Sequence, residues 1–367
     1  MSDQTYKVAV IGTGMIANSA HIPAWKGLPV DVELVACADI LEDRAVITAE
    51  KQGIPKAYGD WEKMLAEVKP DIVSVCTPNV YHKAPAIAAL KSGAHVCCEK
   101  PITISEKDAN EMYDVAAAAG RELFITQTTR FTNRNLAAKE LIDAGRLGEM
   151  YYAECGWLRR RGIPKWGVFH MREHNAGGPI YDLGVHVLDL VVWAMGNPTI
   201  VAVSGQAVCK FGNKDEDLAT SLADSGAPSG VITPRPYDYR EYNVEDFASA
   251  FFRLEDGGAI VLRTSWAANV PNGLERTFIL GTEAGLQLVP SLELIANVDR
   301  YQTNVAIKTP GEEDVAFAGH HMHMAHALRV IRGEEEKVVK RAEVVNVMRA
   351  LEGLYKSAEL GREVQLV

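Results

Sequence analysis

The feature that most constrains the fold is a glycine-containing turn close to the amino terminus. Residues 6–11, Tyr-Lys-Val-Ala-Val-Ile, are mostly apolar and suit a buried parallel strand. They run directly into residues 12–17, Gly-Thr-Gly-Met-Ile-Ala, which match the pattern G-x-G-x-x-A. The first glycine permits a tight turn, the second lets the backbone approach a pyrophosphate, and the small last residue allows close packing of helix on strand. The stretch predicts a βαβ nucleotide-binding unit with phosphates at a helix amino terminus.

The next predicted strand, residues 32–38, is followed by an acidic residue, Asp39, 25 residues after Gly14. In dinucleotide-binding units, an acid roughly 20 residues beyond the glycines hydrogen-bonds the ribose 2′-hydroxyl. A carboxylate at this position repels a 2′-phosphate, so NAD is the predicted cofactor and NADP is disfavoured. Arg44 favours NADP instead, because a nearby arginine can accommodate the 2′-phosphate.

Strands and helices alternate over the first part of the chain. Further strands are predicted at residues 71–76, 95–98 and 123–126, and helices at 60–68, 82–92 and 105–119. This alternation predicts an α/β, doubly wound parallel sheet of the Rossmann type over residues 1–128. In such sheets, ligands bind beyond the carboxyl ends of the strands.

One of these strand ends carries a charged pair. The apolar strand 95–98 is followed by Glu99, Lys100 and Pro101, and the proline ends the strand because it has no amide hydrogen. At the mouth of a cleft, a lysine can donate a hydrogen bond to, or share a proton with, a hydroxyl or carbonyl. An ordinary solvated ion pair is the alternative, and the surrounding motifs favour a functional site.

From residue 129 onward the pattern changes. After a helix at 135–144, strand-like runs follow one another without alternating helices, and Asp256-Gly257-Gly258 is typical of a hairpin turn. These runs are 151–155, 201–208, 248–253, 259–265, 277–281, 286–289 and 305–308. Residues 213–242 are polar and indicate a long surface excursion, and helices are predicted at 323–332 and 342–360. Residues 129–367 therefore form a predicted second domain of the α+β class, built on an antiparallel sheet.

Charge and composition exclude several classes of protein. The net charge is −10 and no long basic run occurs, which argues against a nucleic-acid partner. No apolar run approaches the roughly 18 residues of a membrane helix, and no signal peptide is recognisable. The six cysteines lack both disulfide-framework and zinc-type spacing. We therefore expect a cytoplasmic protein without a membrane partner.

A second stretch of chemical interest is residues 177–189, Gly-Gly-Pro-Ile-Tyr-Asp-Leu-Gly-Val-His-Val-Leu-Asp. The glycines and the proline suit a loop that enters a helix. Asp182, His186 and Asp189 follow at spacings of four and three, so they are predicted to share one helix face. Polar side chains on an apolar helix need partners or a function. A core histidine satisfied by an aspartate is the alternative, and the Lys100 strand end favours the functional interpretation.

Taken together, these motifs resemble those of the glucose–fructose oxidoreductase/inositol dehydrogenase (Gfo/Idh/MocA) family. The resemblance also includes Thr77-Pro78-Asn79 with His82, and the ending from Ser357 to Val364. It covers nearly the whole chain. It implies a Rossmann domain followed by a domain on an open, mostly antiparallel sheet. It also implies NAD(P)-dependent hydride transfer to or from a hydroxyl or carbonyl of a sugar, cyclitol or glycoside.

The resemblance also implies roles for individual residues. His186 would accept a proton, Lys100 would hydrogen-bond the reacting oxygen, and Asp182 would orient the substrate or the imidazole. The cofactor-binding residues would be Gly12, Gly14, Met15, Ile16, Asp39, Arg44, Thr77, Asn79, His82 and Glu99. The substrate-binding candidates are Arg130, Arg161 and Trp166, because guanidinium groups bind hydroxyls or anions and indole rings stack on sugars. For the loop that holds Arg161 and Trp166, a solvated basic loop is the alternative.

Four histidines, at positions 320, 321, 323 and 326, suggest a metal cluster at first sight. No carboxylate lies at a suitable sequence spacing, and hydride transfer needs no metal, so no metal is predicted. Two other functions stay open: an NAD-dependent glycosidase that oxidises its substrate transiently at C3, and a non-catalytic dinucleotide-sensing protein. An open sheet with an uncovered apolar face predicts a homodimer or homotetramer formed through the C-terminal sheet.

Overall fold

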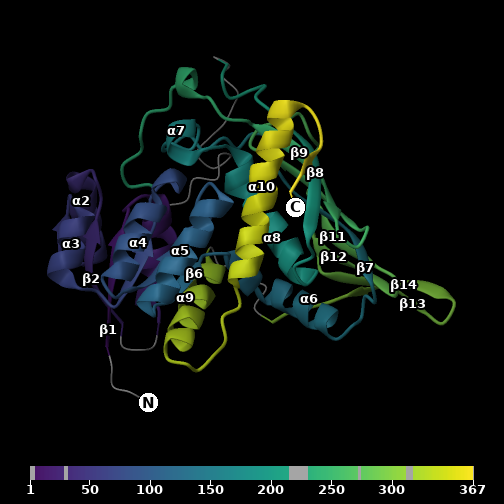
Figure 1. The fold of residues 1–367 in the computed structure, drawn as a ribbon, viewed down its shortest axis with the longest axis horizontal. Helices are drawn as coiled ribbons and strands as arrows, with labels where there is room; N and C mark the ends of the chain where they lie inside the picture. Colours follow the sequence, from purple (N-terminus) through teal and green to yellow (C-terminus); the bar gives the residue numbers. More distant parts are fainter. Residues whose placement is uncertain (1–4, 29–31, 215–229, 272–273, 311–316, 367) are drawn as a thin grey trace.

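The computed structural model describes residues 5–28, 32–214, 230–271, 274–310 and 317–366. Over these residues the chain forms a six-stranded sheet in its N-terminal part and a nine-stranded sheet in its C-terminal part (Figure 1). The fold class predicted from the sequence, a Rossmann domain joined to a domain on an open, mostly antiparallel sheet, is confirmed.

The N-terminal sheet is parallel throughout and has the strand order β3-β2-β1-β4-β5-β6. This is the doubly wound order, whose direction reverses between β1 and β4 and leaves a crevice at their carboxyl ends. The strands are β1 (Tyr6–Ile11), β2 (Val32–Ala38), β3 (Ala57–Tyr58), β4 (Ile72–Val75), β5 (His95–Cys98) and β6 (Leu123–Ile125). Strand β3 was not predicted, because two residues are too few to show a periodicity.

Helices connect these strands. They are α1 (Ile22–Lys26), α2 (Glu42–Gln52), α3 (Trp61–Val68), α4 (Lys83–Lys91) and α5 (Glu106–Ala119), and a π-helical turn, Ala17–His21, precedes α1. Local residues cap both ends of α5: the Ser105 hydroxyl accepts a hydrogen bond from the Asp108 amide at 3.2 Å, and Gly120 ends the helix in the left-handed conformation. Capping by local side chains explains why these boundaries were readable from the sequence.

The C-terminal sheet has the order β14-β13-β12-β11-β7-β10-β9-β8-β15, and only its β7–β10 pair is parallel. Its strands are β7 (Met150–Leu158), β8 (Ile200–Val208), β9 (Phe247–Leu254), β10 (Ala259–Ser265), β11 (Thr277–Gly281), β12 (Ala284–Val289), β13 (Glu293–Val298), β14 (Tyr301–Ala306) and β15 (Val364–Gln365). The predicted β9–β10 hairpin is confirmed, and Gly257 in its turn has a φ of +90°.

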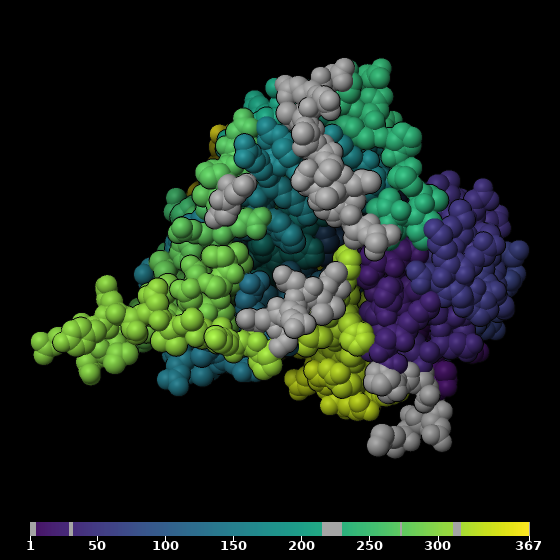
Figure 2. All heavy atoms as spheres, turned by 180° about the vertical axis from the view of Figure 1, so that it is seen from behind, coloured from purple at the N-terminus to yellow at the C-terminus, as the bar shows by residue number. Residues whose placement is uncertain are grey.

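The β13–β14 hairpin differs from the prediction. A strand was expected at residues 305–308, whereas β14 ends at Ala306 and pairs with β13, which was not expected. The hairpin extends away from the body of the molecule (Figure 2). Because solvent reaches both of its faces, its sequence lacks the alternation of apolar and polar residues that marks a half-buried strand.

Helices cover one face of the C-terminal sheet. The helices of this part are α6 (Asn133–Asp143), α7 (Arg172–Asn175), α8 (Val185–Ala194), α9 (Ala318–Ile331) and α10 (Arg341–Leu360). Phe252, Leu262 and Ile279 are fully buried in the core that α8 and α10 share with the sheet. Their neighbours Phe251 and Phe278 alternate onto the opposite face, where Phe251 is 37% exposed. Among the described residues, no helix covers this second face (Figure 1), so assembly through the C-terminal sheet stays a prediction.

Helix α9 returns to the N-terminal sheet. Its residues Met324, Ala327 and Leu328 are buried in one cluster with Tyr6 of β1 and Phe124 of β6. The helix begins at Ala318, five residues before the predicted start. Helix α9 therefore packs a segment from the C-terminal part of the chain against the N-terminal sheet. A domain boundary near residue 128 stays a prediction.

The remaining expectations concern cysteines and membranes. All six cysteines are free thiols, and five of them are buried. In the part of the chain that the structure describes, no helix is both long and apolar enough to cross a membrane.

Candidate active site

A cavity of about 1140 Å³ lies between the two sheets. It is lined by the glycine-containing turn and the carboxyl ends of β2, β4 and β5 on one side, and by residues around α8 on the other. Every predicted site residue except Arg130 and Arg161 lines this cavity. The chain therefore brings together residues from position 12 to position 186 at one place.

The glycine-containing turn has the geometry that a dinucleotide requires. Gly12 has a φ of +87°, and a Cβ atom there would lie 2.7 Å from the carbonyl carbon and oxygen of Cys76. A Cβ atom on Gly14 would meet nothing within 4 Å and would enter the open cavity. Ala17 is fully buried, as close helix–strand packing demands. The turn thus fits a pyrophosphate that approaches the backbone at Gly14.

Asp39 and Arg44 lie side by side at the end of β2. The Asp39 carboxylate accepts hydrogen bonds from the Thr13 amide at 2.9 Å and the Leu41 amide at 3.0 Å. Arg44 Nη1 lies 3.8 Å from Asp39 Oδ2, and Arg44 Nε donates to the Thr233 hydroxyl at 3.0 Å. The backbone amides hold the carboxylate where a ribose is expected, and both groups that bear on NAD versus NADP face the cavity.

Lys100 and Asp182 join the two domains at the centre of the cavity. Lys100 Nζ donates to the Asp182 backbone carbonyl at 2.8 Å and lies 3.2 Å from Asp182 Oδ1. The Trp266 indole donates to Asp182 Oδ2 at 2.8 Å. Burial alone would raise the pKa of Asp182, but the charges of Lys100 and Arg159 outweigh it and hold that pKa below its usual value. Asp182 is therefore a carboxylate that orients the Lys100 ammonium.

His186 is held as a neutral imidazole. Burial, followed by the nearby charge of Lys100, lowers the pKa of His186 to about 3. Its Nδ1 is buried and has no hydrogen-bond partner among the described residues. A neutral imidazole in a cavity beside an ammonium group can accept a proton from a bound hydroxyl.

Asp189 does not share the cavity with Asp182 and His186, which corrects the prediction of one common polar face. The chain winds as a π-helical turn over Ile180–Gly184 before α8 begins. Asp189 has no exposed surface and forms a bidentate ion pair with Arg130, at 2.6 and 2.7 Å.

Arg130 is therefore a structural residue, and its prediction as a substrate ligand is wrong. Its guanidinium group is fully buried, also binds the Glu343 carboxylate, and lies 5.5 Å from the Trp193 ring. These contacts link the end of the N-terminal sheet to α8 and α10. All of them come from residues at least 59 positions away, so no local pattern could reveal them.

Arg161 is a second correction. Its guanidinium group donates to the Ala268 carbonyl at 3.2 Å and to Asn269 Oδ1 at 2.8 Å, outside the cavity. Arg159 lines the cavity instead. Trp166 does line it, and its indole nitrogen is buried without a partner among the described residues. The sequence has three consecutive arginines here, and no local pattern shows which of them faces the cavity.

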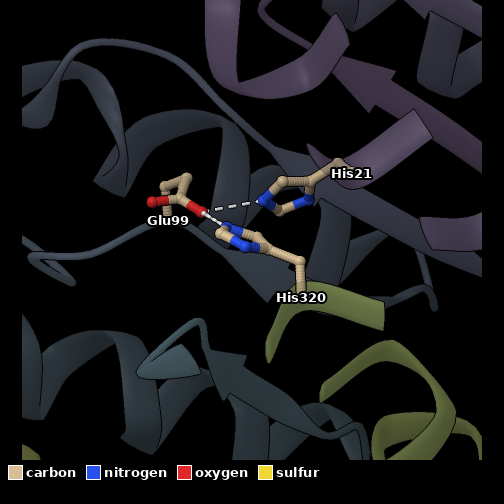
Figure 3. Close-up of side chains that lie close together, drawn as sticks. All are labelled: His21, Glu99 and His320. Atoms are coloured by element: carbon tan, nitrogen blue, oxygen red, sulfur yellow. Dashed lines mark hydrogen bonds and ion pairs between the residues drawn. The ribbon is translucent and has the colours of Figure 1, made fainter. Parts of the chain in front are cut away.

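Glu99 is the centre of a buried cluster that the sequence did not predict (Figure 3). Glu99 Oε1 lies 2.8 Å from His21 Nε2 and 3.4 Å from His320 Nε2, and it accepts a hydrogen bond from the Thr126 hydroxyl at 2.8 Å. Burial would raise the pKa of Glu99, but its bonds to the two imidazoles hold it well below the usual value. No carboxylate lies at a suitable sequence spacing from His320, and the fold instead brings Glu99 there from 221 positions away.

The same three side chains have the types and spacing that a metal ion needs, with ligand atoms within 4.8 Å of one another. The imidazoles and the Thr126 hydroxyl already satisfy the carboxylate by hydrogen bonds. The absence of a metal stays a prediction.

The turns that follow β4 and β5 are tied together by His82. Its Nδ1 lies 2.7 Å from the Pro101 carbonyl oxygen and its Nε2 lies 2.7 Å from the Thr77 carbonyl oxygen. Asn79 donates to the Asn175 carbonyl at 3.1 Å and so links the first domain to α7. These residues hold the strand ends in position around the cavity.

Comparison with known proteins agrees with this geometry. Residues 6–127 match a family described as "Oxidoreductase family, NAD-binding Rossmann fold", and residues 135–287 match the "GFO/IDH/MocA C-terminal domain". The D-glucoside 3-dehydrogenase of Escherichia coli (strain K12) is 31% identical over 100% of this chain and 99% of its own. The D-xylose 1-dehydrogenase (NADP(+)) 2 of Haloferax volcanii is 28% identical over 97% of this chain and 98% of its own.

Solved structures support the fold. Levoglucosan dehydrogenase in complex with NADH superposes with a TM-score of 0.81 at 18% identity, over 99% of this chain and 100% of its own. An NAD-binding oxidoreductase from Klebsiella pneumoniae gives a TM-score of 0.79 at 23% identity, over the full length of both. With the glycine turn, the lysine strand end and the helix of His186 arranged around one cavity, the chain belongs to the Gfo/Idh/MocA family and is an NAD-binding oxidoreductase.

Proposed function

We propose that this enzyme transfers a hydride between NAD and a hydroxyl-bearing carbon of a sugar or glycoside. The observation that carries the proposal is the placement of Lys100, Asp182 and His186 together, in the same cavity as the glycine turn. The nicotinamide, when bound, supplies the hydride acceptor or donor. The protein supplies the groups that bind the reacting oxygen and move its proton.

The three residues divide this task. Lys100 Nζ, anchored by Asp182, has a further hydrogen available to donate to the reacting oxygen. This stabilises negative charge on that oxygen as its proton leaves. The neutral imidazole of His186 accepts the proton. In the opposite direction, the imidazolium returns the proton to a carbonyl oxygen.

The rest of the cavity supports a carbohydrate. Trp157, Trp166 and Trp266 line it, together with Arg159 and the Asp182 carboxylate. Aromatic faces beside charged groups suit a ligand with apolar ring faces and a rim of hydroxyls. The full-length similarity to a D-glucoside 3-dehydrogenase makes pyranosides the first compounds to test, with the hydroxyl at C3 as the first candidate.

The test is NADH formation with a panel of methyl glycosides, aldoses and cyclitols, using wild type, Lys100→Met, His186→Ala and the double variant. Each single change is expected to lower turnover by roughly 10² or more, and the double variant should lose less than the product of the two. Lys107→Met and His321→Ala are matched controls, because both side chains are exposed. NAD affinity, measured separately by fluorescence, should stay within about twofold of wild type, because the glycine turn is unchanged.

Two outcomes would contradict the proposal. Near wild-type turnover of Lys100→Met would mean that Lys100 does not act on the reacting oxygen. Hydrolysis of a glycoside without net NADH formation would mean that the enzyme is a glycosidase that uses NAD only transiently.

A further inference from the structure

The long excursion predicted at residues 213–242 reaches the N-terminal domain. Its described part from Gly230 to Arg235 leaves the C-terminal domain and lies against the cofactor side of the cavity, and Figure 2 shows these green atoms resting on the purple and blue N-terminal domain. Val231, Ile232, Thr233, Pro234 and Arg235 all line the same cavity as Gly12, Gly14 and Asp39. We call residues 230–235 the strap.

One end of the strap contacts the helix that follows the glycine turn. A Cβ atom built on Gly230 would lie 1.9 Å from the Ser19 hydroxyl oxygen, 2.8 Å from the Ser19 amide nitrogen and 2.9 Å from the Met15 carbonyl oxygen. Only a glycine can approach this backbone so closely. The strap therefore touches the helix whose amino terminus is expected to face the phosphates.

The middle of the strap contacts the side chain beside Asp39. The Thr233 hydroxyl accepts a hydrogen bond from Arg44 Nε at 3.0 Å, across 189 positions of sequence. The strap is thus bonded to a residue that lines the predicted adenosine end of the cleft.

The other end of the strap is fixed to the C-terminal domain. Arg235 forms a bidentate ion pair with Glu241, with both bonds at 2.7 Å, and its amide donates to the Trp166 carbonyl at 3.2 Å. A segment held at both ends and bonded in the middle closes one side of the cleft.

From these contacts we propose that the strap is the outer wall of the NAD site and limits the rate at which the dinucleotide leaves. A dinucleotide bound along Gly14 and Asp39 lies beneath Val231 to Pro234. It departs only after the Arg44–Thr233 bond breaks and the strap lifts from Ser19. The inference rests on NAD binding and is independent of which sugar the enzyme oxidises.

The experiment measures NADH release by stopped-flow fluorescence, with an excess of NAD as the displacing ligand. Thr233→Val keeps the side-chain shape and removes the hydrogen bond to Arg44, and loss of one such bond is expected to speed release about three- to tenfold. Gly230→Ala forces the strap away from Ser19 and should speed release at least as much. The controls are Thr303→Val, on the β13–β14 hairpin, and Gly285→Ala, whose added methyl group meets no atom closer than 3.5 Å.

A second readout is hydrogen exchange of the peptide that contains residues 231–235. Bound NAD should slow its exchange in wild type and slow it less in Thr233→Val. Release rates equal to wild type in both strap variants, or exchange unaffected by NAD, would overturn the inference. Failure of the proposed sugar chemistry looks different, because NADH would still bind and leave slowly while no sugar was turned over.

Discussion

The corrected role of Arg130 leads to a sharp prediction about stability. Arg130→Met keeps an apolar side chain in the buried site but removes both bonds to Asp189, which has no exposed surface of its own. Removing one partner of a buried pair costs about 3–5 kcal/mol, because the other charge stays buried and uncompensated. At about 2–4 °C per kcal/mol for a large domain, the apparent Tm should fall by about 6–20 °C.

Thermal unfolding followed by circular dichroism measures this fall. Arg253→Met is the matched control, because Arg253 pairs with Glu363 at the surface and is 58% exposed. A surface pair contributes at most about 1 kcal/mol, so this control should melt within a few degrees of wild type. A second variant, Arg130→Met with Asp189→Leu, removes the stranded carboxylate and should recover part of the loss.

The opposite result would restore the role that the sequence suggested. Suppose that the apparent Tm of Arg130→Met equals that of wild type, while its KM for the sugar rises and its NAD affinity is unchanged. Arg130 would then contact the substrate. The ion pair with Asp189 would in that case not hold in solution.

Four further predictions concern the cofactor, pH, assembly and metals. Asp39 should make NAD(H) bind at least tenfold tighter than NADP(H), about 1.4 kcal/mol, in fluorescence titrations, and equal affinities would show that Arg44 dominates. Burial lowers the pKa of His323 in the folded state to about 3, below its ordinary value of 6.5. Between these two pH values the unfolded state binds more protons than the folded state, so the free energy of unfolding falls on acidification. Urea midpoints should therefore drop between pH 7 and pH 5, and should drop less in His323→Gln; an equal drop would exclude His323 as a cause. Light scattering should give a dimer or tetramer at micromolar concentration, because the sheet face around Phe251 is uncovered, and a monomer would rule this out. Protein purified without chelator should contain no stoichiometric metal, and an equivalent of zinc that is lost in His320→Ala would show that the Glu99 cluster is a metal site.

The cofactor half of the site was readable from the sequence because its signals are local. The turn at Gly12 and Gly14 needs a special backbone conformation, and Lys100 follows an apolar strand of four residues that a proline soon ends. Strand direction and the rule that ligands bind at carboxyl ends then place these residues together. Each step uses neighbours in the chain, so one sequence is enough.

The substrate half was readable only in part. His186 and Asp182 were identified from their helical spacing, but the same spacing wrongly grouped Asp189 with them. What separates them is the partner: Asp189 meets Arg130 in the core, whereas Asp182 meets Lys100 in the cavity. A helix face predicts which side chains point in a similar direction, and only the tertiary fold decides what they meet.

The two segments that sequence reasoning left without a function share a physical consequence. Helix α9 brings His320 against Glu99 behind the crevice, and the strap lies along Arg44 at its outer side. His320 and Thr233 both line the cavity. Burial lowers the pKa of His186 to about 3, whereas it raises those of Glu99 and Asp182 against the lowering effect of their partners. In such surroundings the Lys100–Asp182 interaction is stronger than it would be in water, and His186 stays neutral and able to accept a proton. Chain segments that carry no recognisable motif therefore help to enclose the candidate catalytic residues.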